Sequence, residues 1–371
     1  MSPSLSLSRA QVSSLSDGCL LVGASQYYGI VGNGALTVLD ATQNYSARWS
    51  AAISAGVFAC AGHAGCLPLA AAACADGTVQ VFHCEGRETR PLRVWKEHSV
   101  EASCVSWSPL FRSSLVSGGW DGRVHLHSLQ HPRALRCITM PQRAHAQSMV
   151  STPKPAGRSA CTSSRSGCSV HSVDWHPADA CTLLTGDASG QCCIVDLRAR
   201  APLAWEVAWG SGAARPEVLA ARWLWGGHAV AAGTSHGALL TFDIRQLRQP
   251  MSFHAAHSLG VRCMAVSPPG RGGRQLLATG SYDCSVRVWD AGPLLGGNAG
   301  ATRSTAAGGI YTSVPSALQD ASSALLAALT PHSEFVTDVH WLRAPIGKSG
   351  VATQLASVGW DEQVVLSRVC A

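Results

Sequence analysis

Charged residues are scarce in this chain of 371 residues. Asp, Glu, Lys and Arg make up only 13% of the sequence, whereas hydrophobic residues make up 46%. A composition with so little charge and so many hydrophobic residues excludes a chain that is disordered throughout. The 37 glycines supply many tight turns, so the composition favours numerous short strands in an all-β fold.

Blocks of like charge are also lacking. The formal net charge is +6 and the pI is about 8.7, but the arginines are dispersed and the lysines are few. Nucleic-acid binding needs Lys and Arg gathered against phosphates, and a dispersed excess is more typical of a solvated surface. We therefore expect no nucleic-acid partner.

The chain begins without the marks of an export signal. "MSPSLSLSRAQVSSLSDG" has no basic segment followed by an apolar one, and "CLLVGA" is too short to span a bilayer. The 15 cysteines are scattered and odd in number, which favours reduced, mostly buried thiols over a disulfide framework. We expect a soluble, intracellular protein with no direct membrane insertion.

Motifs for catalysis or for ion binding are missing as well. "GNGALT" is not followed by the Lys-Ser or Lys-Thr of a phosphate loop, and no paired carboxylates, reactive cysteine or nucleophile elbow occurs. "CAGHAGC" places Cys60, His63 and Cys66 close together but lacks a fourth ligand and a second cluster. We expect a protein that is not an enzyme and that has no cofactor and no metal.

An internal repeat organises the chain. An apolar strand, small residues, a turn with Asp or Gly and a second alternating strand recur seven times. The copies are "LLVGASQYYGIVGNGALTVLD" (20–40), "LAAAACADGTVQVFH" (69–83), "LVSGGWDGRVHLHS" (115–128), "LLTGDASGQCCIVDLR" (183–198), "AVAAGTSHGALLTFDIR" (229–245), "LLATGSYDCSVRVWD" (276–290) and "LASVGWDEQVVLS" (355–367). Most copies follow another strand that ends in Trp or an equivalent apolar residue. The spacing is about 43 to 47 residues in four of the six intervals, which is typical of propeller blades with four strands each.

Two intervals are longer than the others and contain segments of different composition. Residues 142–168, between blades three and four, are rich in Ser, Pro, Gly and Arg and predict a flexible insertion. Residues 291–330 form a second insertion, between blades six and seven. Leu318, Leu325, Leu326 and Leu329 stand there at near-helical spacing, which predicts a short amphipathic helix. Such a helix suits packing on the propeller flank better than docking a partner. The segment "SLSLS" near the start is a candidate strand to complete the last blade.

Buried polar networks are expected inside three of the blades. In blade six, His257, Thr279, Asp283 and Trp289 can bond in series and hold the loop to the sheet. His98, Ser117 and Asp121 in blade three, and His332, Ser357 and Asp361 in blade seven, form similar partial sets. These groups resemble fragments of a catalytic triad, but buried groups that satisfy one another explain them better.

Seven such copies resemble the WD-repeat β-propellers, which implies one seven-bladed propeller over residues 1–371. A closer resemblance is carried by "ASQYYGIVGNGALTVLD", "VWKEHSVEASCVSW", "SGGWDG", "HSEFVTDVHW" and "SVGWDE". Together these stretches are similar to the receptors for the type-2 peroxisomal targeting signal, the peroxin-seven family. "VFHCEG" and "VHLHSL" depart from that pattern because they lack the usual terminal Trp-Asp, and both insertions are long for the family.

Three carboxylates precede first strands at similar distances. Glu101 and Glu217 lie six residues before Trp107 and Trp223, and Glu334 lies seven before Trp341. A single surface Glu is more often a solvated charge, but three at equivalent places predict a rim that binds a cationic peptide. Large residues beside the turns add apolar surface to that rim: Trp120, Tyr282, Trp360 and Tyr28. Trp120 and Trp360 have the alternative role of covering the central channel.

The resemblance implies the ligand, the partners and the location. The ligand is a nine-residue signal of the Arg-Leu-x5-His-Leu type on cargo proteins, which as a helix spans about 13 Å. The partners are a co-receptor, either the type-1 signal receptor or a dedicated peroxin, and the peroxisomal docking complex. The protein then shuttles between the cytoplasm and the lumen of a peroxisome or glycosome.

Two other functions compete with an import receptor. "VDLR", ending at Arg198, and "FDIR", ending at Arg245, approximate the box of adaptors for cullin-based ubiquitin ligases. The WD-type methylesterase of diphthamide synthesis shares only the propeller fold.

Overall fold

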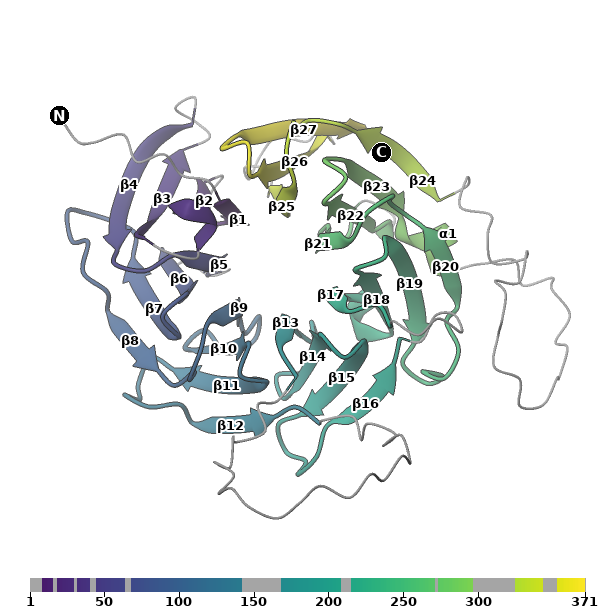
Figure 1. Cartoon of the computed structure of the whole chain (residues 1–371), viewed down its shortest axis with the longest axis horizontal. Coiled ribbons are helices and arrows are strands. Elements are labelled where there is room, and N and C mark those ends of the chain that lie inside the picture. The colour runs from purple at the N-terminus through teal and green to yellow at the C-terminus, as the bar shows by residue number, and fades with distance from the viewer. Residues whose placement is uncertain are drawn as a thin grey trace, which may run out of the picture.

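The computed structural model describes residues 9–15, 19–29, 32–40, 45–63, 68–141, 168–207, 215–270, 273–295, 324–342 and 352–370. Their regular structure is almost entirely β, in seven antiparallel sheets that stand radially around a central axis (Figure 1). Six sheets have four described strands, the seventh has three, and the strands of each sheet follow chain order. This arrangement confirms the predicted seven-bladed, all-β propeller.

The first strand of each blade lies nearest the axis, and the later strands follow outwards (Figure 1). Blades one and two contain β1 (Arg9–Ser14), β2 (Cys19–Ser25), β3 (Gly34–Asp40), β4 (Ser46–Ile53), β5 (Val57–Gly62), β6 (Leu69–Cys74), β7 (Thr78–His83) and β8 (Arg93–Lys96). Blades three and four contain β9 (Ala102–Trp107), β10 (Ser114–Gly119), β11 (Arg123–Ser128), β12 (Arg136–Thr139), β13 (Val170–Trp175), β14 (Thr182–Asp187), β15 (Gln191–Asp196) and β16 (Leu203–Glu206).

The remaining blades repeat this plan. Blade five contains β17 (Val218–Leu224), β18 (Ala229–Thr234), β19 (Ala238–Asp243) and β20 (Ser252–Ala255). Blades six and seven contain β21 (Val261–Val266), β22 (Leu276–Ser281), β23 (Val286–Asp290), β24 (Leu325–Leu329), β25 (Val336–Leu342), β26 (Ala352–Gly359) and β27 (Val364–Cys370). The helical pieces are short: η2 (Tyr27–Gly29), η4 (Trp225–Gly227) and α1 (Ala291–Leu295). No helix in these described ranges has the length and hydrophobicity needed to cross a membrane.

The hydrophobic core lies between neighbouring blades. One cluster joins Val116 and Val124 of blade three to Val170 and Trp175 of blade four. The second strand must approach the next blade closely, and a glycine permits this approach. A Cβ on Gly118 would lie 2.7 Å from Val170 Cγ1, closer than non-bonded carbons pack. Glycines in blades four, five and six meet a valine of the next blade in the same way.

The predicted helix near the end of the second insertion is wrong. Leu325, Leu326 and Leu329 belong to β24, the outer strand of blade six, which pairs with β23. Leu318 lies outside the described residues. β24 alternates half-buried and exposed residues, the period-two pattern of a strand, and pairing with β23 supplies hydrogen bonds that the leucine spacing does not reveal. The segment 291–330 therefore includes the last strand of blade six, and the short helix α1 stands at its beginning.

The two ends of the ring meet where β1 packs beside β25 (Figure 1). The Val12 N–H of β1 donates a hydrogen bond to a carboxylate oxygen of Asp338 in β25, at 3.0 Å. Trp223 N–H makes the same 3.0 Å bond to Asp174 across the junction of blades four and five. At each of these two junctions, a carboxylate thus joins two inner strands. The "SLSLS" segment, residues 4–8, lies outside the described residues.

Candidate peptide-binding site

The predicted polar networks hold the turn between the second and third strands against the loop before the first strand. In blade six, His257 Nδ1 lies 3.1 Å from Asp283 Oδ2, and its Nε2 lies 2.8 Å from Thr279 Oγ1. The indole N–H of Trp289 donates to the same Thr279 oxygen at 3.0 Å. The four predicted residues therefore form one connected series.

Blades three and seven have the corresponding series. His98 Nδ1 lies 3.0 Å from Asp121 Oδ1, and its Nε2 lies 2.8 Å from Ser117 Oγ. His332 is 2.9 Å from both Asp361 Oδ2 and Ser357 Oγ. The histidine side chains are fully buried, so these groups act as structural ties rather than as an open catalytic site.

In blade six, the pKa shifts favour a neutral His257 beside an ionised Asp283. Burial lowers the pKa of His257 to about 4, and the nearby Asp283 offsets only part of this effect. Burial works against ionisation of Asp283, but hydrogen bonds from Ser285 and from the Ser258 N–H keep the pKa of that carboxyl below its ordinary value. The turns they hold are thereby fixed on one face of the disc.

That face, where the first strands begin, is called the top face below. The residue before the turn position that holds Asp121 in blade three and His236 in blade five donates its backbone N–H to the carbonyl of the residue at the mouth of the first strand. Trp120 N–H bonds to the Glu101 carbonyl at 3.0 Å, and Ser235 N–H bonds to the Glu217 carbonyl at 2.9 Å. Glu101 and Glu217 therefore occupy equivalent places, as their spacing predicts.

Glu334 does not occupy the equivalent place. In blade seven Trp360 N–H bonds to the carbonyl of Phe335, at 3.0 Å, so the position corresponding to Glu101 is Phe335. The extra residue in the spacing to Trp341 reflects this shift. Glu334 is exposed. Burial and then the charges of Glu334, Asp283 and Asp361 raise the pKa of Cys284, which places Glu334 near the top-face turns of blades six and seven.

A cavity of about 200 Å³ opens at the top of the central channel. Six blades contribute to its lining, which consists of Phe58, Ser103, Trp120, His171, Glu217, Leu219, Arg262, Tyr282, Thr337 and Trp360. Four of the residues predicted to bind peptide are thus brought together: Glu217, Trp120, Tyr282 and Trp360. Glu101 and Glu334 lie on the same face but are not among the residues that line this cavity. The side chain of Tyr28 lies outside the described residues.

Aromatic rings form two groups around this cavity. Phe58 and Trp120 meet edge to face with ring centroids 5.2 Å apart. On the other side, Phe335 lies 5.2 Å from Tyr282 and 4.9 Å from Trp360. Sequence reasoning missed Phe58 and Phe335. Phe335 holds the place of Glu101 before a first strand, and Phe58 is the second residue of the first strand β5. A large aromatic residue at the mouth of a first strand is the signal that identifies them.

The cavity holds charge of both signs. His171 Nε2 lies 3.2 Å from Glu217 Oε2, and the Glu217 side chain is 46% exposed. The hydrogen bond from His171 lowers the pKa of Glu217, so this carboxylate is ionised at neutral pH. Arg262 lines both this cavity and the channel below it. Sequence reasoning missed His171 and Arg262 because each falls inside an ordinary strand pattern.

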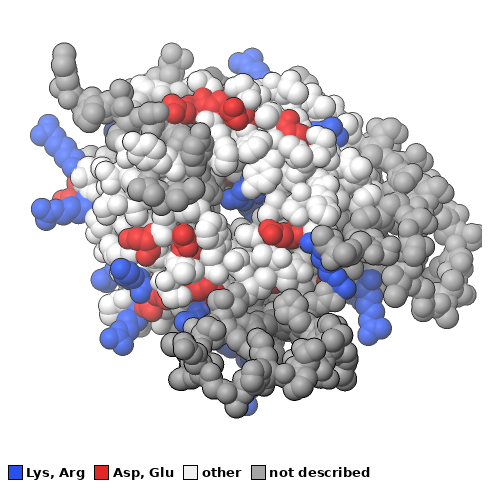
Figure 2. Space-filling view, in the orientation of Figure 1, with Lys and Arg blue, Asp and Glu red and all other residues white. Residues whose placement is uncertain are grey.

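Figure 2 shows how charge is distributed over one face of the disc. Asp and Glu side chains lie at several places around the central opening, whereas most Lys and Arg side chains project from the outer edge. Basic side-chain atoms are also visible inside the opening. A cationic ligand is therefore favoured around the opening and disfavoured at its centre.

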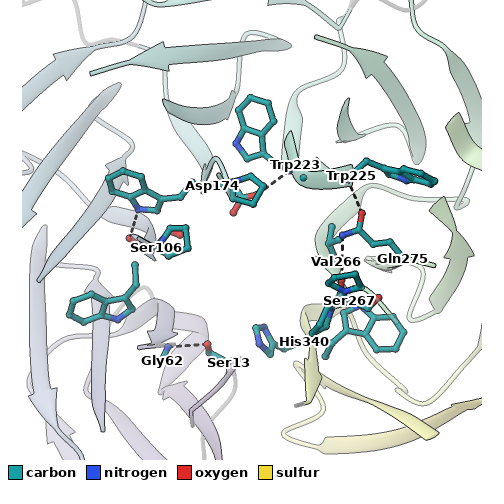
Figure 3. Close-up of a pocket in the computed structure, with 18 of the residues that line it drawn as sticks. Ser13, Gly62, Ser106, Asp174, Trp223, Trp225, Val266, Ser267, Gln275 and His340 are labelled. Atoms are coloured by element: carbon teal, nitrogen blue, oxygen red, sulfur yellow. Dashed lines mark hydrogen bonds between the residues drawn. The ribbon is translucent and has the colours of Figure 1, made fainter. Parts of the chain in front are cut away.

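A larger cavity, of about 700 Å³, lies at the opposite face, where the first strands end. Figure 3 views the disc from the side opposite to Figure 1 and shows Ser13, Gly62, Ser106, Asp174, Trp223 and His340 around this cavity. This face is called the bottom face below. The indole N–H groups of Trp107, Trp175 and Trp341 donate to carbonyls of the preceding blade. These side chains are 2 to 7% exposed, so they serve mainly to join blades.

The remaining motifs contribute little to a site. The Arg198 guanidinium bonds to Asp196 and Asp179 of its own blade, and His63 Nε2 lies 2.9 Å from the Arg112 carbonyl. Burial raises the pKa of Cys60 far above its usual range, and Cys66 lies outside the described residues. These contacts give no support to a ligase-adaptor role for the "VDLR" segment or to a metal site in the "CAGHAGC" stretch.

Comparisons with known proteins agree with this fold. The family model described as WD domain, G-beta repeat matches residues 89–128 and 248–290. A Schizosaccharomyces pombe protein named peroxisomal targeting signal 2 receptor is 23% identical over 96% of this chain and 94% of its own length. The Saccharomyces cerevisiae protein of that name is 24% identical over 95% and 94%. The Mus musculus protein of that name is 31% identical over 31% of this chain and 36% of its own length. The chain carries WD repeats in a seven-bladed propeller and resembles the two yeast receptors over almost its whole length.

Proposed function

We propose that this protein is a receptor for the type-2 peroxisomal targeting signal and binds that signal on its top face. The observation that carries the proposal is the cavity in which Glu217 and three large aromatic residues from blades three, six and seven converge. Relatives named as receptors for this signal align with nearly the entire chain. A non-enzymatic binding role fits a propeller whose histidine–carboxylate pairs are used in structural ties.

The two kinds of surface at this site suit a peptide that is cationic on one side and apolar on the other. An Arg guanidinium can pair bidentately with a carboxylate such as Glu217. Aliphatic side chains can pack against Trp120, Tyr282 and Trp360. Glu101 and Glu334 then act at the periphery of the bound peptide, where they attract positive charge rather than form its central contact.

The finer features of import belong to the proposal too. The signal is an Arg-Leu-x5-His-Leu type helix, which buries little area by itself and must offset the loss of freedom on binding. A co-receptor, either the type-1 signal receptor or a dedicated peroxin, closes over it, and the docking complex receives the assembly. The receptor shuttles between the cytoplasm and the lumen of a peroxisome or glycosome.

Peptide binding to the full chain, with and without co-receptor, tests this function. For Glu217→Gln we expect about 30-fold weaker binding of the signal peptide, or roughly 2 kcal/mol, because one partner of a charge pair is removed. Glu85→Gln is the matched control, since Glu85 is half exposed and also ion-paired, but lies on the outer part of the disc. Affinity should fall as ionic strength rises.

Several outcomes would contradict the proposal. Failure of the wild-type protein to bind the signal peptide even with co-receptor would exclude the function. Equal affinity of Glu217→Gln and wild type would exclude this carboxylate as the reader of the cationic residue. Capture of a cullin-ligase subunit that is lost in Arg198→Ala with Arg245→Ala would favour the adaptor role instead.

A further inference from the structure

Blade three differs from blades six and seven, which have the same histidine–aspartate pair, in the residues of its third strand. Ser117 of β10 faces His125 of β11 in the sheet register, whereas Thr279 of blade six faces Arg287. Two residues later, β11 has His127 where blade six has Trp289. Blade three therefore adds two histidines to a face that already contains His98.

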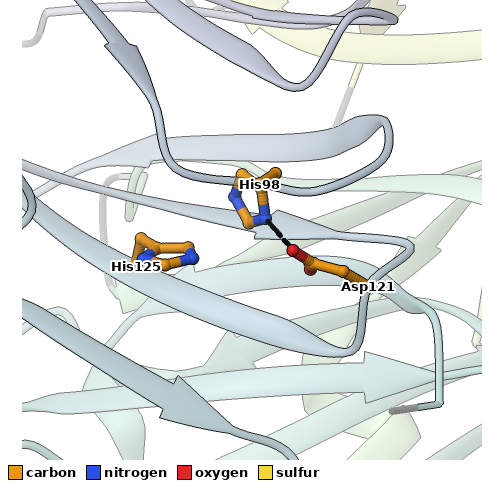
Figure 4. Close-up of side chains that lie close together, drawn as sticks. All are labelled: His98, Asp121 and His125. Carbon is orange, nitrogen blue, oxygen red and sulfur yellow. Dashed lines mark hydrogen bonds and ion pairs between the residues drawn. The ribbon is translucent and has the colours of Figure 1, made fainter. Parts of the chain in front are cut away.

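The side chains of His98, Asp121 and His125 form a compact group (Figure 4). One ligand atom from each of His98, Asp121 and His125 lies within 4.8 Å of those of the other two. The three residues are only 4%, 6% and 3% exposed. The His98 and His125 rings are perpendicular, with centroids 4.6 Å apart.

One ring nitrogen in this group is unsatisfied. His125 Nδ1 is buried and has no hydrogen-bond partner among the described residues. A buried polar atom without a partner is costly and is rare in folded proteins. A bound cation would satisfy it by taking its lone pair.

We propose that His98, Asp121 and His125 bind a divalent cation of the borderline class, such as Zn²⁺. Imidazole nitrogens and a carboxylate oxygen are common zinc ligands, with metal–ligand distances of about 2.0 to 2.2 Å. Such ligands stand roughly 3.3 Å apart around a tetrahedral ion. The His98 and Asp121 atoms, 3.0 Å apart, are already at about this separation, and the His125 nitrogen, within 4.8 Å of them, moves inward by up to about 1.5 Å. A water molecule takes the fourth position.

Coordination requires His98 to change tautomer. The single ring proton, which in the metal-free chain lies on Nδ1 beside Asp121, 3.0 Å away, moves by way of solvent to Nε2, so that the lone pair of Nδ1 is free for the metal and no net proton is released. Nε2–H then donates to Ser117 Oγ, 2.8 Å away. Ser117 in turn lies 2.9 Å from His127 Nε2, which completes the outer support that zinc-bound histidines normally have.

Blades six and seven show why the third ligand matters. His257 with Asp283, and His332 with Asp361, have the same paired geometry. Their third strands present Arg287 and Val365 at the place of His125, and neither residue type is expected to coordinate zinc. The paired histidine and aspartate are therefore a structural tie in blades three, six and seven. Among these three blades, only blade three has the third ligand that a metal site needs.

Equilibrium dialysis of the metal-free full chain against Zn²⁺, followed by elemental analysis, tests the proposal. We expect one tightly held zinc per chain in the wild type and its loss in His125→Arg, which gives blade three the blade-six residue. His254→Gln is the control, because His254 is a buried histidine of blade five whose ring nitrogens have no hydrogen-bond partner within the described part of the chain. It should retain the zinc.

The converse substitution keeps the test decisive if His125→Arg folds poorly. Arg287→His completes the same three-ligand set in blade six, so the zinc content should rise from one to two per chain. Equal zinc content in the wild type and folded His125→Arg, or no gain in folded Arg287→His, would overturn the proposal. The result is independent of peptide binding, so it stands or falls separately from the receptor function.

Discussion

The two ends of the central channel are built from the same seven inner strands. They differ in the interactions that their aromatic side chains make within the fold. At the bottom face, three buried tryptophans donate their indole N–H groups to carbonyls of the preceding blade. At the top face, the aromatic rings contact one another and line a cavity that also contains Glu217 and Arg262. Trp120 is 38% exposed, whereas Trp341 is 2% exposed.

This difference separates stability from binding within one scaffold. Buried side chains whose polar atoms are hydrogen-bonded within the fold are not available to a ligand. Partly exposed aromatic rings and ionised carboxylates, in contrast, can contribute to binding. The larger cavity is therefore not the preferred site, although it has more than three times the volume. The tests below ask whether the two faces can be perturbed independently.

Truncation of a bottom-face tryptophan should have the largest effect. We expect Trp341→Ala to lower the free energy of unfolding by about 4 kcal/mol, because it leaves a cavity and removes the bond to the Ala265 carbonyl. Urea denaturation measures this loss. Trp360→Ala at the top face should cost less than half as much, since Trp360 is partly exposed. A reduced peptide affinity of folded Trp341→Ala would break the proposed separation of the faces.

The middle of the channel should respond to pH. Burial raises the pKa of Asp338 from its ordinary 3.8 to about 6, so between these values the folded chain holds a proton that the unfolded chain has lost. The stability associated with this group is present below about pH 4 and disappears as the pH rises through 6. Asp338→Asn cannot ionise and should be more stable than the wild type by about 2 kcal/mol at neutral pH.

Denaturation midpoints from pH 4 to pH 7 measure this effect. The advantage of Asp338→Asn over the wild type should grow across that range and level off above pH 6. An advantage that does not vary with pH would show that the carboxyl ionises as readily in the fold as in the unfolded chain. Peptide affinity should change little, because Asp338 lies below the top cavity.

Two bottom-face tryptophans offer the smallest and sharpest comparison. Trp175 donates to the Ser106 carbonyl at 3.1 Å, whereas Trp223 Nε1 is buried without a partner among the described residues. Both are almost equally buried. Trp175→Phe should therefore destabilise the protein by about 1 kcal/mol more than Trp223→Phe. Equal losses in calorimetry would mean that the inter-blade hydrogen bond contributes nothing net.

Much of this architecture was predictable because the same sequence pattern, and with it the same local structure, recurs in blade after blade. The paired strands, the turn aspartates at Asp121, Asp283 and Asp361, and their histidine partners recur at regular spacing, and each blade folds by local pairing. The helix expected from the spacing of Leu318, Leu325, Leu326 and Leu329 was wrong over Leu325 to Leu329, the part that the structure describes, because leucine spacing alone does not distinguish a helix from an outer strand. Pairing with β23 decided it.

The site was predictable in part. Turn position alone placed Trp120, Tyr282 and Trp360 on one face, and the cavity includes all three. Glu217, rather than Glu101 or Glu334, enters the cavity, since side-chain direction at the mouth of a strand depends on the neighbouring blade. The shift of one residue that puts Phe335 at the place of Glu101 is set by how blade seven packs, and spacing to a tryptophan did not resolve it.

By itself, the sequence determined the number of blades, the order of strands within them and the residues that hold each turn. Those features follow from contacts between residues near one another along the chain. Only the tertiary structure decided which side chains meet at the axis, because Phe58, Glu217 and Trp360 come from blades far apart in sequence. It also decided that His98 and Asp121 are joined by His125, since the cross-strand register and not the spacing brings the third nitrogen to them.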